Sequence, residues 1–434
     1  MKNRRSKLWA MILMLTTLLS LMSCTTEHVQ QDNPDKIQND DAYSEAYNSE
    51  DAKNAAMDFS VRLFQNSVNC QDKNIRPEDE NVLIAPSSVL TALAMTANGA
   101  KNDTLTQMES TFGIAREPLN DYLRQYLNNL PNEEQNKLHM ANSIWIKDEK
   151  GFTVKEAFVQ TNKSCLNAEV FERNFGKKTL REINSWVKNN TDGMIEEVLS
   201  EIPEDAVMYL INALAFEAEW EEIYKSTQIR KGVFTLINDI EQEVEFMYSE
   251  EDLYLEDDKA TGFVKYYADK EYAFVALLPK EGVTIPEYVE AMSGSQLQEL
   301  LEHPQEVQVN AAIPKFEVEY NILLNTTLES MGIEDAFDEN KADLSGIGTH
   351  ADGNLFVNRV IHKTHMEVDE KGTKAGAATV VEIMCESAME SPEVKTVRLD
   401  RPFIYMIIDC ENNQPVFMGT LNQVYPLLKC GTIE

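Results

Sequence analysis

Basic residues are scarce in this sequence. Lysine and arginine together number 39, against 73 aspartate and glutamate residues, and the formal net charge is -34 at pH 7. A field of that sign repels the phosphates of nucleic acids and anionic lipids, so we expect no nucleic-acid partner. We interpret the surplus of acidic side chains as an aid to solubility.

Cysteine is scarce too, with six residues in a chain of 434. They are widely spaced and form no Cys-x-x-Cys pair, so neither a disulfide framework nor a zinc site is indicated. His362 and His365 lie three residues apart in an extended apolar segment. On a strand they would point to opposite faces and could not share a metal ion. We therefore expect no metal and no other cofactor.

The common catalytic motifs are also missing. The sequence has no Gly-x-Ser-x-Gly, no His-Glu-x-x-His, no phosphate-binding P-loop and no paired glycines of a dinucleotide site. A hydrolase would need side chains that the fold brings together, and Cys385 with His362 is the pair that this alternative would use. We expect the protein not to be an enzyme.

No hydrophobic run is long enough to span a bilayer comfortably. The basic segment Lys2–Lys7 and the apolar run Leu8–Leu19 have the pattern of an export signal. Ser23-Cys24, which follows, resembles the lipobox of bacterial lipoproteins. This resemblance implies cleavage after residue 23, lipidation of Cys24, and an exported protein that contacts the membrane only through its lipid. An ordinary cleaved signal peptide is the alternative.

The rest of the chain divides simply. Residues 24–52 are acidic and poor in large apolar side chains, which predicts a flexible linker. Residues 53–427 have a globular texture, and 428–434 form a tail. Helical periodicity is typical of the first half, as in 55–70 and 89–98. Strands are predicted at 141–146, 209–214, 263–267, 273–278, 307–313, 355–360, 403–408 and 416–418. The prediction is one α+β domain.

Residues 370–387 are unusual for a loop and for a strand, because they are rich in Gly and Ala and contain no Pro. Read with the period of a strand, alternate residues form an uncharged face. This face consists of Thr373, Ala375, Ala377, Thr379, Val381 and Ile383. Such a segment can be an exposed loop and can also become a strand half buried in a sheet. A plain edge strand, or a Gly/Ala linker before Pro392, is the alternative.

This segment resembles the reactive-centre hinge of the serpins, where Glu-x-Gly-Thr precedes a run of small residues. Other segments are similar to serpin motifs in the same order, namely Asn81–Met108, Ile183–Val187, Thr191–Ile195, Ile211–Phe216, Val397–Ile408 and Val416–Leu421. The resemblance covers residues 53–427. It implies a single serpin domain of the α+β class, with about nine helices, three β-sheets and an exposed reactive-centre loop at about 370–395.

The resemblance also implies a function. A serpin offers its loop to a serine or cysteine protease, forms a covalent acyl-enzyme, and inserts the cleaved loop into its central sheet, which traps the protease. By this match the hinge consists of Glu370, Gly372, Thr373, Ala375, Ala377 and Ala378, with Thr373 entering first. We expect a monomer whose partner is a protease. A non-inhibitory serpin that acts as a binding module is the alternative.

Two further features follow from the match. Counting along the loop from Glu370 makes Glu386–Ser387 the reactive bond, with Met384–Cys385 and Cys385–Glu386 as alternatives. The resemblance also implies a polar centre beneath the sheet, called the shutter, and an entry point for the loop, called the breach. The residues implied are Ser88, Asn212 and His362 for the shutter and Trp220 for the breach. Ala85 stands where a Ser is usual.

Overall fold

The computed structural model describes residues 49–69, 80–130, 136–204, 206–351, 353–373 and 394–424. The α-helices of these residues are α1 (Ser49–Val68), α2 (Pro86–Ala97), α3 (Asn102–Phe112), α4 (Arg116–Asn129), α5 (Glu156–Leu166), α6 (Lys177–Asn190), α7 (Ile285–Ala291), α8 (Gly294–Glu302) and α9 (Asn325–Ser330). Short 3-10 helices cover Ser226–Gln228, Ala268–Lys270 and Asp335–Phe337.

The strands dominate the second half of the chain. They are β1 (Val82–Ile84), β2 (Asn136–Lys147), β3 (Phe152–Val154), β4 (Glu169–Arg173), β5 (Met208–Glu219), β6 (Ile229–Thr235), β7 (Glu241–Glu256), β8 (Ala260–Tyr266), β9 (Tyr272–Pro279), β10 (Gln305–Pro314), β11 (Phe316–Leu323), β12 (Gly348–His350), β13 (Ile361–Val368), β14 (Gly372–Thr373), β15 (Val394–Arg398), β16 (Phe403–Asp409) and β17 (Gln414–Leu421). Nine helices and three sheets within the described ranges confirm the predicted α+β domain.

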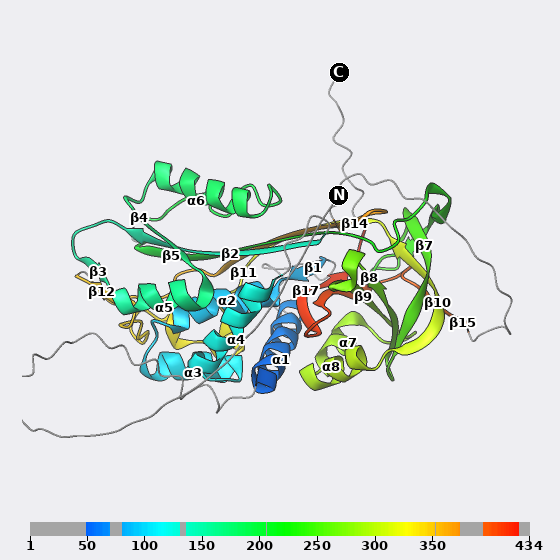
Figure 1. Cartoon of the computed structure of the whole chain (residues 1–434), viewed down its shortest axis with the longest axis horizontal. Coiled ribbons are helices and arrows are strands. Elements are labelled where there is room, and N and C mark those ends of the chain that lie inside the picture. Colours follow the sequence, from blue (N-terminus) through cyan, green and yellow to red (C-terminus); the bar gives the residue numbers. More distant parts are fainter. Residues whose placement is uncertain are drawn as a thin grey trace, which may run out of the picture. The chain divides into compact units, whose positions relative to one another are not determined.

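One sheet, called the central sheet below, has six strands in the order β11-β13-β14-β5-β2-β4. Figure 1 shows α6 on one face of it and α2 and α5 on the other. A strand covered on both faces must be apolar on both sides, and the middle of β5 reads Ile-Asn-Ala-Leu-Ala-Phe. Trp145 of β2, Trp186 of α6 and Ile211 of β5 belong to the apolar cluster that joins α6 to this sheet.

The second sheet has nine strands in the order β1-β17-β16-β9-β8-β7-β10-β15, with β6 paired to β7. Strands β9 and β17 are buried at every position and form much of the main core. The two large sheets come together where β5 ends, because Trp220 forms an isolated β-bridge with Tyr267 just after β8. This junction positions the site described below. The third sheet pairs β12 with β3.

Two predicted helix boundaries and one predicted strand were wrong. Helix α1 begins at Ser49, inside the predicted linker, and Ala52 is already buried. Helix α2 begins at Pro86, since the first helical position needs no N–H donor. Residues 355–360 form no strand: the N–H of Val357 donates to the carbonyl of Ala336, and that of Val360 to the side chain of Asn325. The segment is therefore bound to a 3-10 helix and to the start of α9, and does not join a ladder.

Candidate functional site

The hinge begins with a tight turn, Asp369–Gly372, called the hinge turn below. The Asp369 carboxylate accepts hydrogen bonds from the backbone N–H of Lys371 at 2.8 Å and of Gly372 at 3.2 Å. Glycine is needed at 372, because a Cβ there would lie 2.0 Å from the carbonyl oxygen of Ala218. The hinge turn thus leads the chain from the end of β13 directly against β5.

Thr373 follows the hinge turn and occupies a strand position in the central sheet. It pairs with Val368 of β13 on one side and with Ala218 of β5 on the other. Its side chain is buried, and its hydroxyl lies 2.6 Å from the hydroxyl of Tyr267. The first side chain of the hinge is therefore already between the two strands.

An ion pair holds the outer side of the hinge turn. The Glu370 carboxylate lies 2.7 Å from the Lys315 ammonium, which also reaches Glu245 at 3.3 Å. Partial burial works to raise the pKa of Glu370, but the hydrogen bond and charge of Lys315 outweigh it, so this pKa is lowered. The Glu370 carbonyl accepts from the N–H of Tyr224 at 2.9 Å. Side chain and backbone thus fix Glu370 together.

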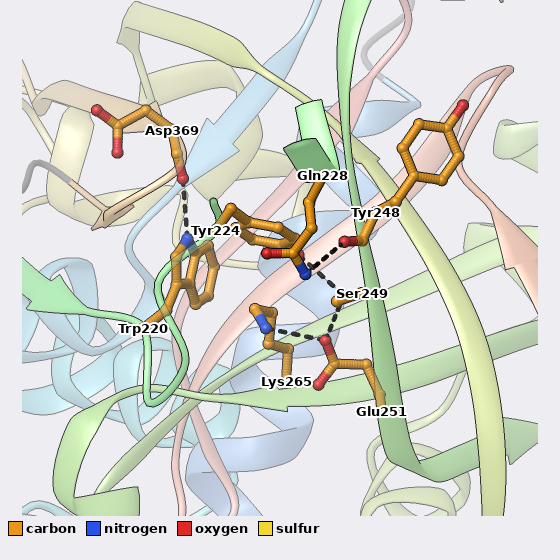
Figure 2. A network of polar contacts seen from close by, with 8 residues as sticks. All are labelled: Trp220, Tyr224, Gln228, Tyr248, Ser249, Glu251, Lys265 and Asp369. Carbon is orange, nitrogen blue, oxygen red and sulfur yellow. Dashed lines mark hydrogen bonds and ion pairs between the residues drawn. The ribbon is translucent and has the colours of Figure 1, made fainter. Parts of the chain in front are cut away.

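Trp220 holds the hinge turn from below. Its backbone N–H donates to the Lys371 carbonyl at 2.8 Å. Its indole N–H donates to the Asp369 carbonyl, also at 2.8 Å (Figure 2). The indole is buried and stacks on the Tyr267 ring, with centroids 4.5 Å apart and planes 9° apart. The predicted breach residue therefore contacts the hinge directly.

Beyond Thr373, the two strands that flank it separate. Among the described residues, β5 and β13 form no ladder with each other and are joined only through β14. A cavity of about 870 Å³ lies along both strands and is lined by Leu210, Asn212, Leu214, Ile361, His362 and Thr364, together with residues of α2 and of the segment after α6. In the described residues, β5 and β13 thus have no strand between them other than the two residues of β14.

Three polar side chains beneath this opening form a cluster, called the shutter cluster here. The Ser88 hydroxyl donates to the side-chain oxygen of Asn212. The Asn212 amide donates to Asn142 at 2.8 Å, and the Asn142 amide donates to the Leu166 carbonyl at 2.7 Å. The cluster therefore connects α2, β5, β2 and the end of α5 across the face of the sheet.

His362 lies on the opposite side of the opening, on β13. It is buried, and its Nε2 accepts a hydrogen bond from the N–H of Ala85 at 3.1 Å. Burial lowers its pKa from 6.5 to about 4, so the ring is neutral at neutral pH. Two strand positions along, the Thr364 hydroxyl donates to the Leu83 carbonyl at 2.7 Å. These bonds hold β13 to the segment before α2.

The structure describes seven of the fifteen site residues taken from the sequence, and the shutter differs from the prediction in one contact. Ser88 and Asn212 are hydrogen-bonded, but within the described residues His362 bonds to the Ala85 backbone and not to Asn212. Ala375, Ala377, Ala378, Met384, Cys385, Glu386, Ser387 and Cys24 lie outside the described residues.

Sequence reasoning missed Asn142, Lys315, Tyr224 and Tyr267, which contact the site from distant segments. Only Asn142 carried a signal, as a polar residue within an apolar strand. The described residues contain no group of three or more His, Cys, Asp or Glu side chains able to hold a metal ion. None of their helices is long and apolar enough to cross a membrane.

Comparisons with known proteins agree with the resemblance to the serpins. The family model described as Serpin (serine protease inhibitor) matches residues 54–424. The chain is 30% identical to Serpin B9 of Homo sapiens over 386 residues, which cover 85% of this chain and 98% of that protein. It is 30% identical to Iris of Ixodes ricinus over 388 residues, covering 86% and 98%.

Solved structures give the same result. The thermophilic serpin tengpin in its native state matches with a TM-score of 0.79 and 45% identity, over 87% of this chain and 95% of that chain. Tengpin in its latent state matches with a TM-score of 0.75 and 44% identity, over 87% and 99%. The residues matched by the family model, 54–424, include the hinge turn and the shutter cluster.

Proposed function

The chain belongs to the serpin family, and on that premise we propose that it is a one-shot inhibitor of a serine or cysteine protease. The protease cleaves the reactive-centre loop and is held on it as an acyl-enzyme. The cleaved loop then enters the central sheet as a new strand before water can release the enzyme. The protein acts as a consumed substrate and not as an enzyme.

The observation that carries this proposal is the position of Thr373. It is buried and paired on both sides, between β5 and β13, while these two strands form no ladder with each other in the part of the chain that the structure describes. An 870 Å³ cavity lies along the same two strands. This arrangement supports an insertion that would start at Thr373 and proceed toward the cavity.

Hydrogen bonding contributes to the free energy of insertion. Strand β5 has 12 residues, and only Glu219 and Ala218 pair with β14. Pairing the other positions of this edge would add about ten hydrogen bonds, at about 0.5–1.5 kcal/mol each. This gain of about 5–15 kcal/mol is opposed by the entropy of ordering about ten residues, at about 1–2 kcal/mol each. Burial of the apolar side chains of the loop would therefore have to supply the net free energy that makes trapping irreversible.

The loop sequence guides the choice of target. With Glu386–Ser387 as the reactive bond, the protease would accept an acidic side chain and would have a basic pocket. Cleavage at Met384–Cys385 or Cys385–Glu386 would instead fit elastase-like, chymotrypsin-like or papain-like proteases. Between Lys374 and Lys395 there is no Lys or Arg, which disfavours trypsin-like targets.

We also propose that inhibition takes place outside the cell membrane. The export signal and the Ser23-Cys24 sequence support a protein anchored by lipid on Cys24, and the acidic segment after it would serve as a spacer. A lipoprotein of this kind would act as a monomer against proteases that reach the cell.

The substitution Thr373→Arg tests the proposal. Thr373 is 2% exposed, and an unpaired guanidinium in that position would cost several kcal/mol. The hinge would then fail to insert, and the yield of complexes that resist boiling in detergent should fall by more than about tenfold, with cleaved protein in their place. Thr373→Ala is the matched control, because a small side chain still fits.

Undiminished trapping by Thr373→Arg would contradict the role given to the hinge. If the unaltered protein is only cleaved by every protease offered, or is left intact by all of them, inhibition is the wrong function. A non-inhibitory binding module would then replace it.

A further inference from the structure

A lysine is buried behind the breach. Lys265 of β8 has a side chain only 4% exposed, and its ammonium lies 2.9 Å from the carboxylate of Glu251 on β7, which is 11% exposed. Buried ion pairs add little net stability, because removing two charges from water costs about as much as their attraction returns. A pair in this position therefore calls for a role other than general stability.

Two aromatic rings complete the surroundings of this cation. The Lys265 ammonium lies 4.7 Å from the centre of the Tyr224 ring and 5.4 Å from that of Trp220. Burial works to lower the pKa of Lys265, but Tyr224 and Glu251, with Glu222 beyond them, outweigh it, so this pKa is raised. The cation is thus fixed between an acid and two aromatic faces.

A chain of hydrogen bonds continues from the acid back to Tyr224. The Ser249 hydroxyl lies 2.5 Å from the Glu251 carboxylate and 3.1 Å from the Tyr224 hydroxyl (Figure 2). Tyr224 is therefore held twice, by its ring over Lys265 and by its hydroxyl through Ser249. Four side chains, Lys265, Glu251, Ser249 and Tyr224, form one unit, called the breach network here.

The breach network ends on the hinge turn. Trp220 and Tyr224, whose rings flank Lys265, donate their backbone N–H groups to the carbonyls of Lys371 and Glu370. The Trp220 indole donates to one more carbonyl of the hinge turn, that of Asp369. The three carbonyls are thus bound by two residues whose rings lie beside the buried cation.

We propose that Lys265, with Glu251, is a positioning residue for loop insertion: it holds residues 220–224 so that the hinge turn is formed before any protease arrives. This inference rests on the proposed inhibitory function. Ordering a turn of several residues costs conformational entropy, at about 1–2 kcal/mol for each residue. If the turn is already formed, this entropy cost does not slow insertion during the time in which water can hydrolyse the acyl-enzyme. The breach network therefore sets the speed of the first step of insertion.

Lys265→Met is the direct test, since it keeps the length of the side chain and removes the charge. We expect insertion to be slower by about tenfold. A second quantity is the number of inhibitor molecules consumed for each protease trapped. This number minus one equals the rate of acyl-enzyme hydrolysis divided by the rate of insertion, so it should rise by the same factor. The rate at which the protease first cleaves the loop should not change. Fluorescence of the purified full chain during the reaction measures the rates, and a gel of the products measures the ratio of cleaved to trapped protein.

Three further variants separate positioning from stability. Lys280→Met is the matched control, because Lys280 pairs with Glu256 at the other end of β8 and is far from the hinge turn. Lys265→Arg should restore trapping in part, since it keeps the cation. The double substitution Lys265→Met with Glu251→Gln leaves no unpaired charge, and should still insert slowly if the single variant does not fold.

Hydrogen exchange gives a readout that needs no protease. In Lys265→Met, the amides of Trp220 and Tyr224 should exchange about tenfold faster than in the unaltered protein. Equal exchange, together with an equal partition between trapping and cleavage, would overturn the positioning role. If the unaltered protein traps no protease, the proposed function fails, and exchange alone then decides whether Lys265 holds the hinge turn.

Discussion

Acid should weaken this fold through His362. The ring is buried, its Nε2 accepts from the Ala85 N–H, and its pKa lies at about 4 in the folded protein, against 6.5 for an ordinary histidine. As the pH falls below 6.5 the unfolded chain takes up this proton first, so stability is lost from there down to pH 4 and not further. The difference between the two pKa values corresponds to about 3 kcal/mol.

The assay is urea unfolding at several pH values between 7 and 4, for the unaltered protein and for His362→Gln. Glutamine keeps an acceptor for the Ala85 N–H but does not titrate. The unaltered protein should lose about 3 kcal/mol more than the variant over this range. Parallel curves for the two proteins would refute the reasoning, because the buried ring would then contribute nothing to the pH dependence.

Two other substitutions test single contacts of the site. Gly372→Ala places a Cβ 2.0 Å from the Ala218 carbonyl oxygen, so β14 should not form. Incubation with a protease should then yield cleaved protein. Full trapping would show that the hinge turn tolerates a side chain. Asn142→Leu removes the hydrogen bonds to Asn212 and Leu166 from a buried position. This should lower the free energy of unfolding by about 2–4 kcal/mol. An unchanged midpoint of urea unfolding would contradict the shutter cluster as described.

The fold could be predicted from motifs along residues 53–427 that resemble those of serpins, and the strand position of Thr373 from a signal within one short segment. Alternation along residues 370–387 and the Glu-x-Gly-Thr sequence lie within one short segment, and the structure places Thr373 in a buried strand position. The opposite orientation of His362 and His365 also followed from strand geometry: His362 is buried, whereas His365 is partly exposed and lies 3.9 Å from Glu317.

Contacts between distant segments could not be predicted in this way. Lys315 and Glu370 are far apart in the sequence, and nothing near either of them marks the other as its partner. Lys265 reads as a solvent-facing lysine of an ordinary strand, and only the arrival of Glu251, Trp220 and Tyr224 from other segments makes its burial possible. Charge pairs of this kind depend on tertiary packing, which periodicity does not report.

The predicted strand at 355–360 shows the reverse error. Its apolar residues suggested a ladder, and Leu355, Val357 and Val360 do pack against the main core. The hydrogen bonds of the segment, however, go to Ala336 in a short 3-10 helix and to Asn325 at the start of α9. These three side chains are only partly buried and Phe356 is exposed, so the hydrophobic pattern indicated contact with the core but not the partner of the backbone.

One measurement tests the central claim most directly. The full chain is incubated with glutamyl-specific, elastase-like, chymotrypsin-like and papain-like proteases, and the products are run on a denaturing gel with mass spectrometry of the released C-terminal peptide. The account predicts a complex with at least one protease that survives boiling in detergent, and a peptide that begins at Ser387, or at Cys385 or Glu386 for the alternative bonds. Cleavage of the loop without any stable complex would contradict the proposal that this protein traps its target.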